Sequence, residues 1–349
     1  MYTTQDIHFL NRREFLKLSS AAVLGLFALN ILDLDPALGQ PLATPKMGRI
    51  VSNLVDAYDT PSLDGKVLKT FWKDLVLPIT EVAIGTGKPD HNHIWYEMNH
   101  EGYVHSGSVQ PVNIAANPIA DSIPETGVLG EITVPFTDAC WRTVYPKKIA
   151  YRLYYETTHW VTRSFKDDQG NPWYEILEDF YQYKFYVNAT HMRIAGKDEV
   201  TPLSPDVPAN QKHIEVRLKD QVVVAYEYGN PVQMMRCAAG LETWDGYFTP
   251  EGTFFTDYKR PSRHMINGSH AAANTFDLPG VPWVSFIDEN GISFHGTYWH
   301  NDFGRPRSHG CINLPSSAAK WVYRWTTPAV PFEEQKIFKR EGTRVEISA

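Results

Sequence analysis

The chain has 349 residues, of which 43% are hydrophobic and 21% charged, and its formal net charge at pH 7 is −7. A length of this order predicts two or three domains, because one domain usually holds about 100 to 200 residues. The acidic balance, and a sequence without a block rich in Lys and Arg, argue against a nucleic-acid-binding protein. The composition is that of a globular protein rich in aromatic residues and identifies no partner by itself.

The N-terminal segment, residues 1–39, is predicted to be an export signal. Residues 11–17 carry an arginine pair and resemble a twin-arginine signal, and an apolar run of small residues follows from 21 to 32. This run is shorter than the about 20 residues that span a bilayer comfortably. The sequence Ala37-Leu38-Gly39 forms an imperfect cleavage site, so the segment is either removed or kept as an anchor. An N-terminal amphipathic helix is the alternative, and the expected location is periplasmic or facing the cell wall.

Two stretches, residues 48–115 and 130–196, each predict an all-β module, because short apolar runs alternate there with turn signals. Three short sequences of the first stretch recur in the second at offsets between 78 and 83 positions, as expected for a tandem repeat with loop insertions. They are Asp56-Ala57-Tyr58 with Asp138-Ala139-Cys140, Trp95-Tyr96-Glu97 with Trp173-Tyr174-Glu175, and Tyr103-Val104 with Tyr186-Val187. The pattern resembles bacterial SH3-like barrels, which in cell-wall enzymes are interpreted as wall-binding or spacing modules. A role in the barrel core is favoured for both tryptophans, so we assign no binding residue in either module.

A third domain is predicted over residues 210–349. The connector before it, residues 197–211, holds three prolines and predicts a semi-rigid spacer. Alternating strands dominate the rest of the chain, with one helix expected over 316–325 and ended by Pro328. The fold class expected for the whole protein is therefore mostly β, with two small barrels followed by a larger β domain.

The stretch Ser308-His309-Gly310-Cys311-Ile312-Asn313 carries the chemistry, together with His295, which lies sixteen positions before the cysteine. A thiol acts as a nucleophile when a base can take its proton and preorganised hydrogen-bond donors can stabilise the oxyanion that forms. A histidine at the end of a strand predicted to begin at Ile292 and end at His295, and a Gly-Cys pair on a following loop, could supply both. The alternative is a buried structural cysteine beside loop histidines, since free cysteines are often buried.

The motif resembles the L,D-transpeptidase catalytic domain, also called the YkuD-like domain. The resemblance rests on His295-Gly296-Thr297, on residues 308–313 and on the turn at 249–254, and it implies a β-sandwich-like fold. It also implies that Cys311 attacks a peptidoglycan stem peptide at the carbonyl between a diamino acid and a D-amino acid. The D-residue leaves, and an amine of a neighbouring stem resolves the thioester into an L,D cross-link. Such an enzyme serves peptidoglycan biosynthesis, cell-wall organisation and cell shape, and carbapenems are expected to acylate its thiol.

The resemblance assigns roles within the motif. His295 is the expected base, ahead of His309, and the carbonyl of Gly296 is expected to fix its tautomer. The backbone N–H groups around Gly310 and Cys311 are expected to face an oxyanion. The candidates for substrate contacts are Ser308, His309, Asn313, Arg305 and Tyr298. For Arg305 and Arg307 a solvated polar loop is an equally favoured interpretation, and His264 and His300 are expected in the cleft or at the surface.

No metal and no cofactor are expected. His91, His93 and His100 could suggest a metal site, but no cysteine or third suitably spaced ligand accompanies them. A disulfide between Cys140 and Cys237 is disfavoured because the two lie in different predicted domains.

The expected partners are peptidoglycan stem peptides, not nucleic acid, with membrane association only through an uncleaved signal segment. Two alternatives to the transpeptidase stay open. One is an L,D-carboxypeptidase of the same fold, in which water resolves the thioester. The other is a non-catalytic wall-binding protein whose third domain is vestigial.

Overall fold

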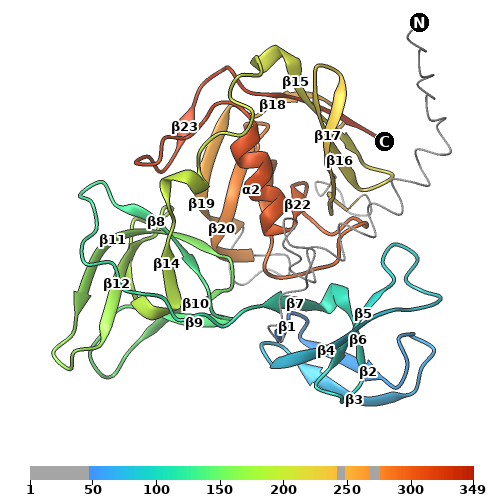
Figure 1. The fold of residues 1–349 in the computed structure, drawn as a ribbon, viewed down its shortest axis with the longest axis horizontal. Helices are drawn as coiled ribbons and strands as arrows, with labels where there is room; N and C mark the ends of the chain where they lie inside the picture. The colour runs from blue at the N-terminus through green and yellow to red at the C-terminus, as the bar shows by residue number, and fades with distance from the viewer. Residues whose placement is uncertain (1–46, 242–247, 268–275) are drawn as a thin grey trace, which may run out of the picture. The chain divides into compact units, whose positions relative to one another are not determined.

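The computed structural model describes residues 47–241, 248–267 and 276–349, so the predicted signal segment lies outside the described residues. Strands dominate this part of the chain, and its α-helix is α2 (Ser316–Trp325) (Figure 1). The predictions of a mostly β protein and of a helix over 316–325 are confirmed. Within these ranges, no helix has the length and apolar character needed to cross a membrane.

The first seven strands form one sheet in the order β3-β2-β6-β5-β4-β1-β7. Their bounds are β1 (Met47–Ile50), β2 (Leu54–Tyr58), β3 (Val67–Trp72), β4 (Val76–Ile84), β5 (Ile94–Met98), β6 (Tyr103–His105) and β7 (Val109–Val112). A 3-10 turn, η1 (Ser106–Ser108), precedes the last strand. We call this sheet module 1.

The next seven strands, module 2, form a sheet in the order β10-β9-β13-β12-β11-β8-β14. Their bounds are β8 (Val128–Ile132), β9 (Phe136–Cys140), β10 (Ile149–Tyr154), β11 (Thr158–Lys166), β12 (Pro172–Leu177), β13 (Lys184–Asn188) and β14 (Met192–Ile194). A 3-10 turn, η2 (Ala189–His191), again precedes the last strand. Counted from the first strand of each module, the two strand orders are the same.

The repeated sequences take equivalent places in the two modules. Trp95 and Trp173 are each the second residue of the fifth strand, and both are buried. Their burial supports the core role. The pairing, however, leaves both sheets open, because the end strands β3 and β7, like β10 and β14, are not joined in the described structure. Closed barrels were expected, but β3 has Phe71 as its one buried residue and lies as an exposed edge.

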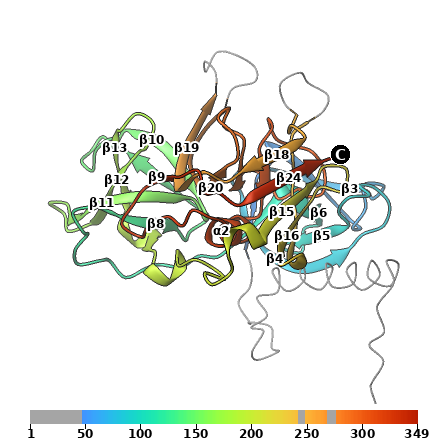
Figure 2. The same ribbon diagram turned by 90° about the horizontal axis from the view of Figure 1, so that it is seen from above.

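The third part contains two five-stranded sheets, reached through η3 (Lys197–Glu199) and η4 (Ala209–Gln211). The order β17-β16-β15-β24-β18 joins β15 (Lys212–Arg217), β16 (Val222–Glu227), β17 (Asn230–Arg236), β18 (Gly252–Phe255) and β24 (Arg344–Ser348). In Figure 2, β24 lies between β15 and β18, in agreement with this order. The order β22-β21-β20-β19-β23 joins β19 (Tyr258–Asn267), β20 (Phe276–Phe286), β21 (Ser293–Gly296), β22 (Ile312–Leu314) and β23 (Ile337–Phe338).

One apolar core joins these two sheets to α2. Val223 of β16, Phe294 of β21 and Val322 of α2 are fully buried in the same cluster. The helix packs on β20, β21 and β22. Because core side chains pack as densely as organic crystals, this arrangement holds β21 and β22 rigidly in place.

Candidate active site

Two neighbouring parallel strands carry the predicted catalytic pair. The register of β21 and β22 pairs Phe294 with Ile312 and His295 with Asn313, and Cys311 directly precedes β22. Side chains alternate between the faces of a sheet, so His295 lies on the same face as Asn313 and Cys311. Phe294 and Ile312 are fully buried in the core on the opposite face. Strand pairing therefore brings the histidine and the thiol, far apart in sequence, to one face.

The thiol of Cys311 is half-buried and lies between two oxygens. Its Sγ is 3.6 Å from the hydroxyl of Ser293 and 3.6 Å from the carbonyl of Gly291. Burial raises the pKa of the Cys311 thiol, and hydrogen bonding to Ser293 only partly opposes this rise. The thiol is therefore protonated at neutral pH and needs a base before it can react as a thiolate.

His295 has the tautomer that a base requires. Its Nδ1 lies 3.0 Å from the carbonyl oxygen of Gly296, the group that the family resemblance implied for this contact. Since a carbonyl only accepts, Nδ1 carries the hydrogen and Nε2 keeps its lone pair. Burial lowers the pKa of His295 to about 4, so the ring is neutral at pH 7. A Cβ at Gly296 would lie 2.8 Å from Pro282, so a side chain there would displace the carbonyl.

The loop before the thiol is held by two hydroxyls. The hydroxyl of Ser308 accepts from the Gly310 N–H at 3.1 Å and donates to the carbonyl of Cys311. The hydroxyl of Thr249 donates to the Gly310 carbonyl at 2.7 Å and accepts from the N–H of Gly240. Gly310 has a φ of 115°, a conformation that favours glycine. In this arrangement Ser308 shapes the loop, and the Gly310 N–H that was expected to face an oxyanion is directed at Ser308.

His309 lies on the same loop as Cys311. Its ring centroid is 5.4 Å from that of Phe276, the first residue of β20. Partial burial lowers the pKa of His309. The contact with Phe276 suits a supporting position better than that of the base, because the tautomer-fixing carbonyl belongs to His295.

The arginines expected to bind substrate are paired within the protein. Asp302, which is 2% exposed, accepts from Arg305 at 2.6 Å and from Arg307 at 2.8 Å. Its other oxygen lies 2.6 Å from Nε2 of His91 in module 1. Burial would raise the pKa of Asp302, but His91 and the arginines hold it well below its usual range. Both guanidinium groups therefore have a carboxylate partner before any substrate arrives.

Tyr298 is also used within the fold. Its hydroxyl donates to the carbonyl of Pro279, and its ring stacks on Tyr154 of module 2 with centroids 5.2 Å apart. The backbone carbonyl of Tyr298 accepts from Arg49 of module 1. The side chain is 4% exposed, which argues against the predicted substrate contact.

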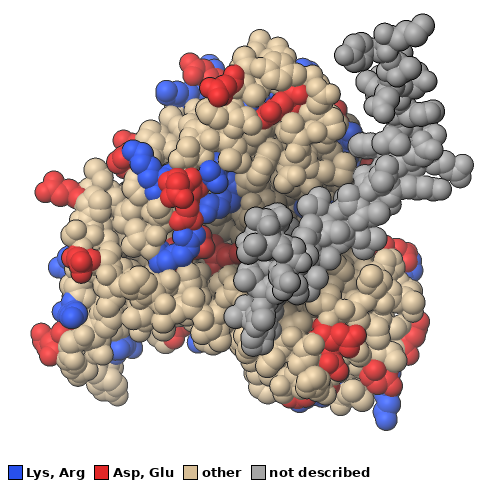
Figure 3. All heavy atoms as spheres, in the orientation of Figure 1, with Lys and Arg blue, Asp and Glu red and all other residues tan. Residues whose placement is uncertain are grey.

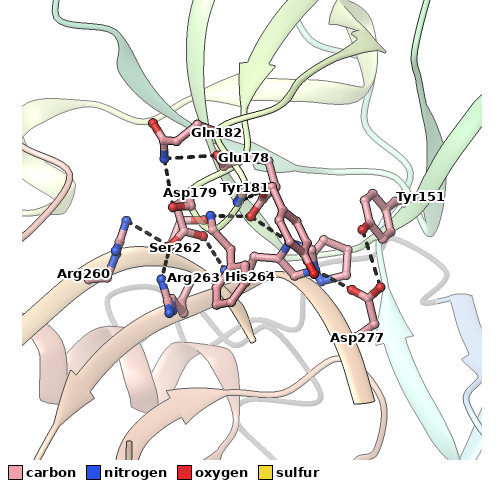
Figure 4. A network of polar contacts seen from close by, with 12 residues as sticks. Tyr151, Glu178, Asp179, Tyr181, Gln182, Arg260, Ser262, Arg263, His264 and Asp277 are labelled. Carbon is pink, nitrogen blue, oxygen red and sulfur yellow. Dashed lines mark hydrogen bonds and ion pairs between the residues drawn. The ribbon is translucent and has the colours of Figure 1, made fainter. Parts of the chain in front are cut away.

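His264, expected in the cleft or at the surface, is buried between two carboxylates. Its Nδ1 lies 2.7 Å from Glu178 of module 2, and its Nε2 contacts Asp277 of β20 (Figure 4). Burial would lower the pKa of His264, but the two carboxylates raise it. The neighbouring Asp179 binds Arg260 at 3.0 Å and Arg263 at 2.6 Å. We call these six residues the His264 network; it joins module 2 to β19 and β20.

A pocket beside the His264 network is lined by both module 2 and β19, and its lining includes neither Cys311 nor His295. It is therefore separate from the candidate active site. His300 is buried as well, with Nε2 2.9 Å from the side-chain amide of Asn313.

Two groups of residues have the chemistry of metal ligands. His91 is bound to Asp302, and His100 lies 3.2 Å from Glu97 at the surface, so neither is directed at a shared point. A second group, His213, Glu215 and Glu346, has its ligand atoms within 4.8 Å of one another on β15 and β24. Glu215, however, already binds Arg217 at 2.7 Å and the hydroxyl of Tyr226 at 2.9 Å. We therefore assign no metal site to it.

The remaining cysteines are not paired with each other. Cys140 in β9 and Cys237 after β17 are both buried free thiols. Burial raises the pKa of Cys237 to about 12, which makes this thiol unreactive at neutral pH.

Part of this chain is similar to known proteins. Residues 211–347 match the family model of the YkuD L,D-transpeptidase catalytic domain. For this similarity we call residues 211–347 the YkuD-type domain. The YciB protein of Bacillus subtilis (strain 168), whose name assigns it provisionally to the L,D-transpeptidases, is 29% identical over 129 residues. That match spans 34% of this chain and 63% of YciB, less than two thirds of the relative.

Solved L,D-transpeptidase structures are also similar. The enzyme from Mycobacterium smegmatis has 20% identity over 40% of this chain and 59% of its own, with a TM-score of 0.33. The catalytic domain of the E. faecium enzyme acylated by ertapenem has 24% identity over 40% of this chain and 97% of its own, with a TM-score of 0.30.

Several residues of the YkuD-type domain had no specific role in the sequence analysis. Ser293, on the strand with His295, was missed although its alternation with the histidine along the strand could have indicated it. The Thr249 turn was recognised as a motif, but its bond to the Cys311 loop needs the fold. Asp302 was missed entirely: Arg305 and Arg307 lie close to it in sequence, but His91 meets it only through tertiary structure.

Proposed function

We propose that the protein is a cysteine-dependent L,D-transpeptidase that acts on peptidoglycan stem peptides through a thioester on Cys311. The observation that carries this proposal is the pairing of β21 with β22. It sets a neutral His295, with its lone pair on Nε2, on the same face as the thiol. The match of residues 211–347 to the YkuD family supplies the substrate class.

The proposed reaction uses one base twice. His295 Nε2 takes the proton from Cys311 Sγ. The thiolate then attacks the carbonyl carbon that joins the diamino acid to the D-amino acid. The C–N bond then breaks, the imidazolium returns its proton to the departing amine of the D-amino acid, and a thioester remains. In the second half the acceptor amine attacks the thioester, gives its proton to His295, and the C–S bond breaks to release the cross-linked product and the thiol.

The organisation of the chain is part of the proposal. Residues 1–39 would direct twin-arginine export to the periplasm or the wall-facing side of the membrane. The modules at 48–115 and 130–196 would be SH3-like domains that space the catalytic domain, 210–349, from the wall. Their equal strand orders support descent from one repeated unit. On the face shown in Figure 3, Lys and Arg are interspersed with Asp and Glu, and no extended basic patch for nucleic acid is visible.

Incubation with disaccharide-tetrapeptide fragments, followed by mass spectrometry, tests the reaction. A cross-linked dimer is the expected product, whereas a tripeptide alone would identify an L,D-carboxypeptidase. The variant Cys311→Ala should form neither product. Absence of any product with the wild-type protein would favour the non-catalytic wall-binding protein.

Acylation by ertapenem tests the nucleophile independently of the acceptor. The wild-type protein should gain one adduct by intact-protein mass spectrometry, and Cys311→Ala should gain none. The variant Cys140→Ala is the matched control, because it removes a different buried thiol and should still be acylated. An adduct on Cys311→Ala would remove this residue from the mechanism.

A further inference from the structure

His300 contacts the active-site face from a loop that the catalytic motif does not include. It is 4% exposed, and its Nε2 lies 2.9 Å from the side-chain amide of Asn313. Its Nδ1 accepts from the backbone N–H of Asp302 at 3.2 Å. Asn313 is itself 2% exposed and is paired in register with His295.

These contacts decide which way the Asn313 amide points. Because His300 Nδ1 accepts a hydrogen bond, a neutral ring carries its hydrogen on Nε2. Burial lowers the pKa of His300 to about 3, so the ring is neutral at pH 7. An Nε2–H needs an acceptor, so Asn313 must turn its Oδ1 toward the ring. The opposite orientation sets two donors against each other and leaves Oδ1 buried without a partner.

In this orientation the Asn313 N–H2 takes the buried place at which Oδ1 would receive no hydrogen bond from the described residues. A buried donor without an acceptor costs about 1 to 3 kcal/mol, so such a group marks a place where a ligand can bond. Asn313 lies on the face that carries Cys311 and His295. A substrate oxygen there would satisfy the donor.

Module 1 holds the loop that carries His300. Nε2 of His91 binds the Asp302 carboxylate at 2.6 Å, and the Asn301 N–H donates to the carbonyl of Gly107 at 3.1 Å. A Cβ at Gly107 would lie 2.8 Å from Asp302, so glycine permits this close approach. Asn301 and Asp302 are thus both held by module 1. The backbone N–H of Asp302 is the one that fixes the His300 tautomer.

We propose that His300 is a positioning residue, which turns the Asn313 amide so that its N–H2 donates to the substrate oxygen that becomes negative during acylation. Asp302, held by His91 of module 1, keeps the His300 ring in the tautomer that this requires. The role in acylation rests on the proposed function, whereas the tautomer and the amide orientation do not.

Nitrogen-15 NMR of the histidine rings in the wild-type protein tests the orientation without any activity. His300 should appear as the neutral Nε2–H tautomer at pH 7, opposite to His295, which should be the Nδ1–H tautomer. Assignment uses the loss of one signal set in His300→Phe and in His295→Phe. A His300 ring that is charged at pH 7 or protonated on Nδ1 would overturn the proposal, even if the protein proved to be an active transpeptidase.

Two reactions of Cys311 separate positioning from general damage to the site. Acylation by ertapenem develops a negative oxygen, whereas alkylation by iodoacetamide needs only the thiol. In His300→Phe the acylation rate should fall by about tenfold or more, as when an oxyanion donor is lost, while alkylation stays near the wild-type rate. Equal losses in both reactions, or no loss in either, would overturn the role.

The link to module 1 is tested with a matched pair of surface-loop variants. His91→Gln should lower the acylation rate constant with little change in the ertapenem concentration for half-maximal rate, and should shift the His300 ring signals. His93→Gln, two residues away and exposed, should leave both unchanged. If His91→Gln matches the wild-type protein in both measurements, module 1 does not hold His300.

Discussion

Modules 1 and 2 share one strand order but use different loops to contact the YkuD-type domain. Module 1 reaches the loop before Cys311 with His91, which lies between β4 and β5. Module 2 reaches β19 and β20 with Glu178 and Asp179, which lie between β12 and β13. The loops used are not equivalent in the repeat. The two modules thus share a fold, but these two contacts depend on loop residues that are specific to each copy. Strand residues, Arg49 of β1 and Tyr154 of β10, add further contacts to Tyr298.

The two contacts also differ in what they hold. Module 1 binds a loop that leads to the Cys311 thiol, through a carboxylate that also pairs with two arginines. Module 2 binds regular strands through a buried imidazole with a carboxylate on each side. We therefore expect changes at His91 of module 1 to affect catalysis, and changes at Glu178 of module 2 to affect mainly stability.

The largest loss of stability is expected at Arg49, where module 1 meets both other parts. This buried guanidinium binds Asp74 at 2.9 Å and Gln110 at 2.7 Å, donates to the Tyr298 carbonyl, and lies 4.2 Å from the ring of Tyr154. Arg49→Met should lower the free energy of unfolding by about 3 kcal/mol or more, because buried partners lose their cation. Urea denaturation measures the change.

The matched control is Arg152→Met, which removes another cation bound to Asp74. Arg152 is 40% exposed, and exposed ion pairs contribute about 0 to 1 kcal/mol. If Arg49→Met and Arg152→Met lowered the free energy of unfolding by similar amounts, the burial of Arg49 would not add to stability. Arg49 would then not join module 1 to the rest of the protein as described.

A smaller loss is expected within the His264 network. Glu178→Gln keeps the size of the side chain but removes the charge that faces the imidazolium at 2.7 Å. We expect a loss of about 1.5 to 3 kcal/mol, the range for hydrogen bonds to charged groups. Differential scanning calorimetry measures it, with the exposed Glu101→Gln of module 1 as control. The rate at which Cys311 is acylated should stay unchanged in Glu178→Gln. A large fall in this rate would show that module 2, like module 1, affects catalysis.

The smallest predicted effect is a pH dependence of the stability that His264 contributes between module 2 and the YkuD-type domain. The folded-state pKa of His264 is raised, so its stabilisation is fully present below the ordinary value of about 6.5 and is lost as pH rises through the folded-state value. The difference in unfolding free energy between the wild-type protein and His264→Gln should therefore shrink from pH 6 toward alkaline pH. A difference that grows with pH would mean that the ring is neutral in the folded protein.

The local features of this chain could be predicted from its sequence. The repeated Trp-Tyr-Glu segments, the helix over 316–325 and the histidine and cysteine on adjacent elements all depend on short-range pattern. The partners of the charged residues could not be predicted in the same way. His91 and Asp302 are 211 positions apart, and His264 and Glu178 are 86 apart. The sequence therefore offered Arg305 as a substrate contact or as part of a solvated loop, and His264 in the cleft or at the surface. In the structure Arg305 pairs with Asp302, three positions before it, and tertiary packing places Glu178 against His264.

The parallel pairing of β21 and β22 has a consequence for how such a protein can change. Ladder hydrogen bonds, and not the length of the crossover, fix His295 opposite Asn313. Where the crossover between Gly296 and Ile312 is exposed, at Arg305 and Arg307, it can therefore gain or lose residues while His295 and Asn313 stay opposite each other, as surface connections tolerate insertion better than strands do. In this chain the same crossover is the segment held by module 1. Changes in the length or sequence of the crossover could therefore adapt the same pair of strands, β21 and β22, to a different neighbouring domain.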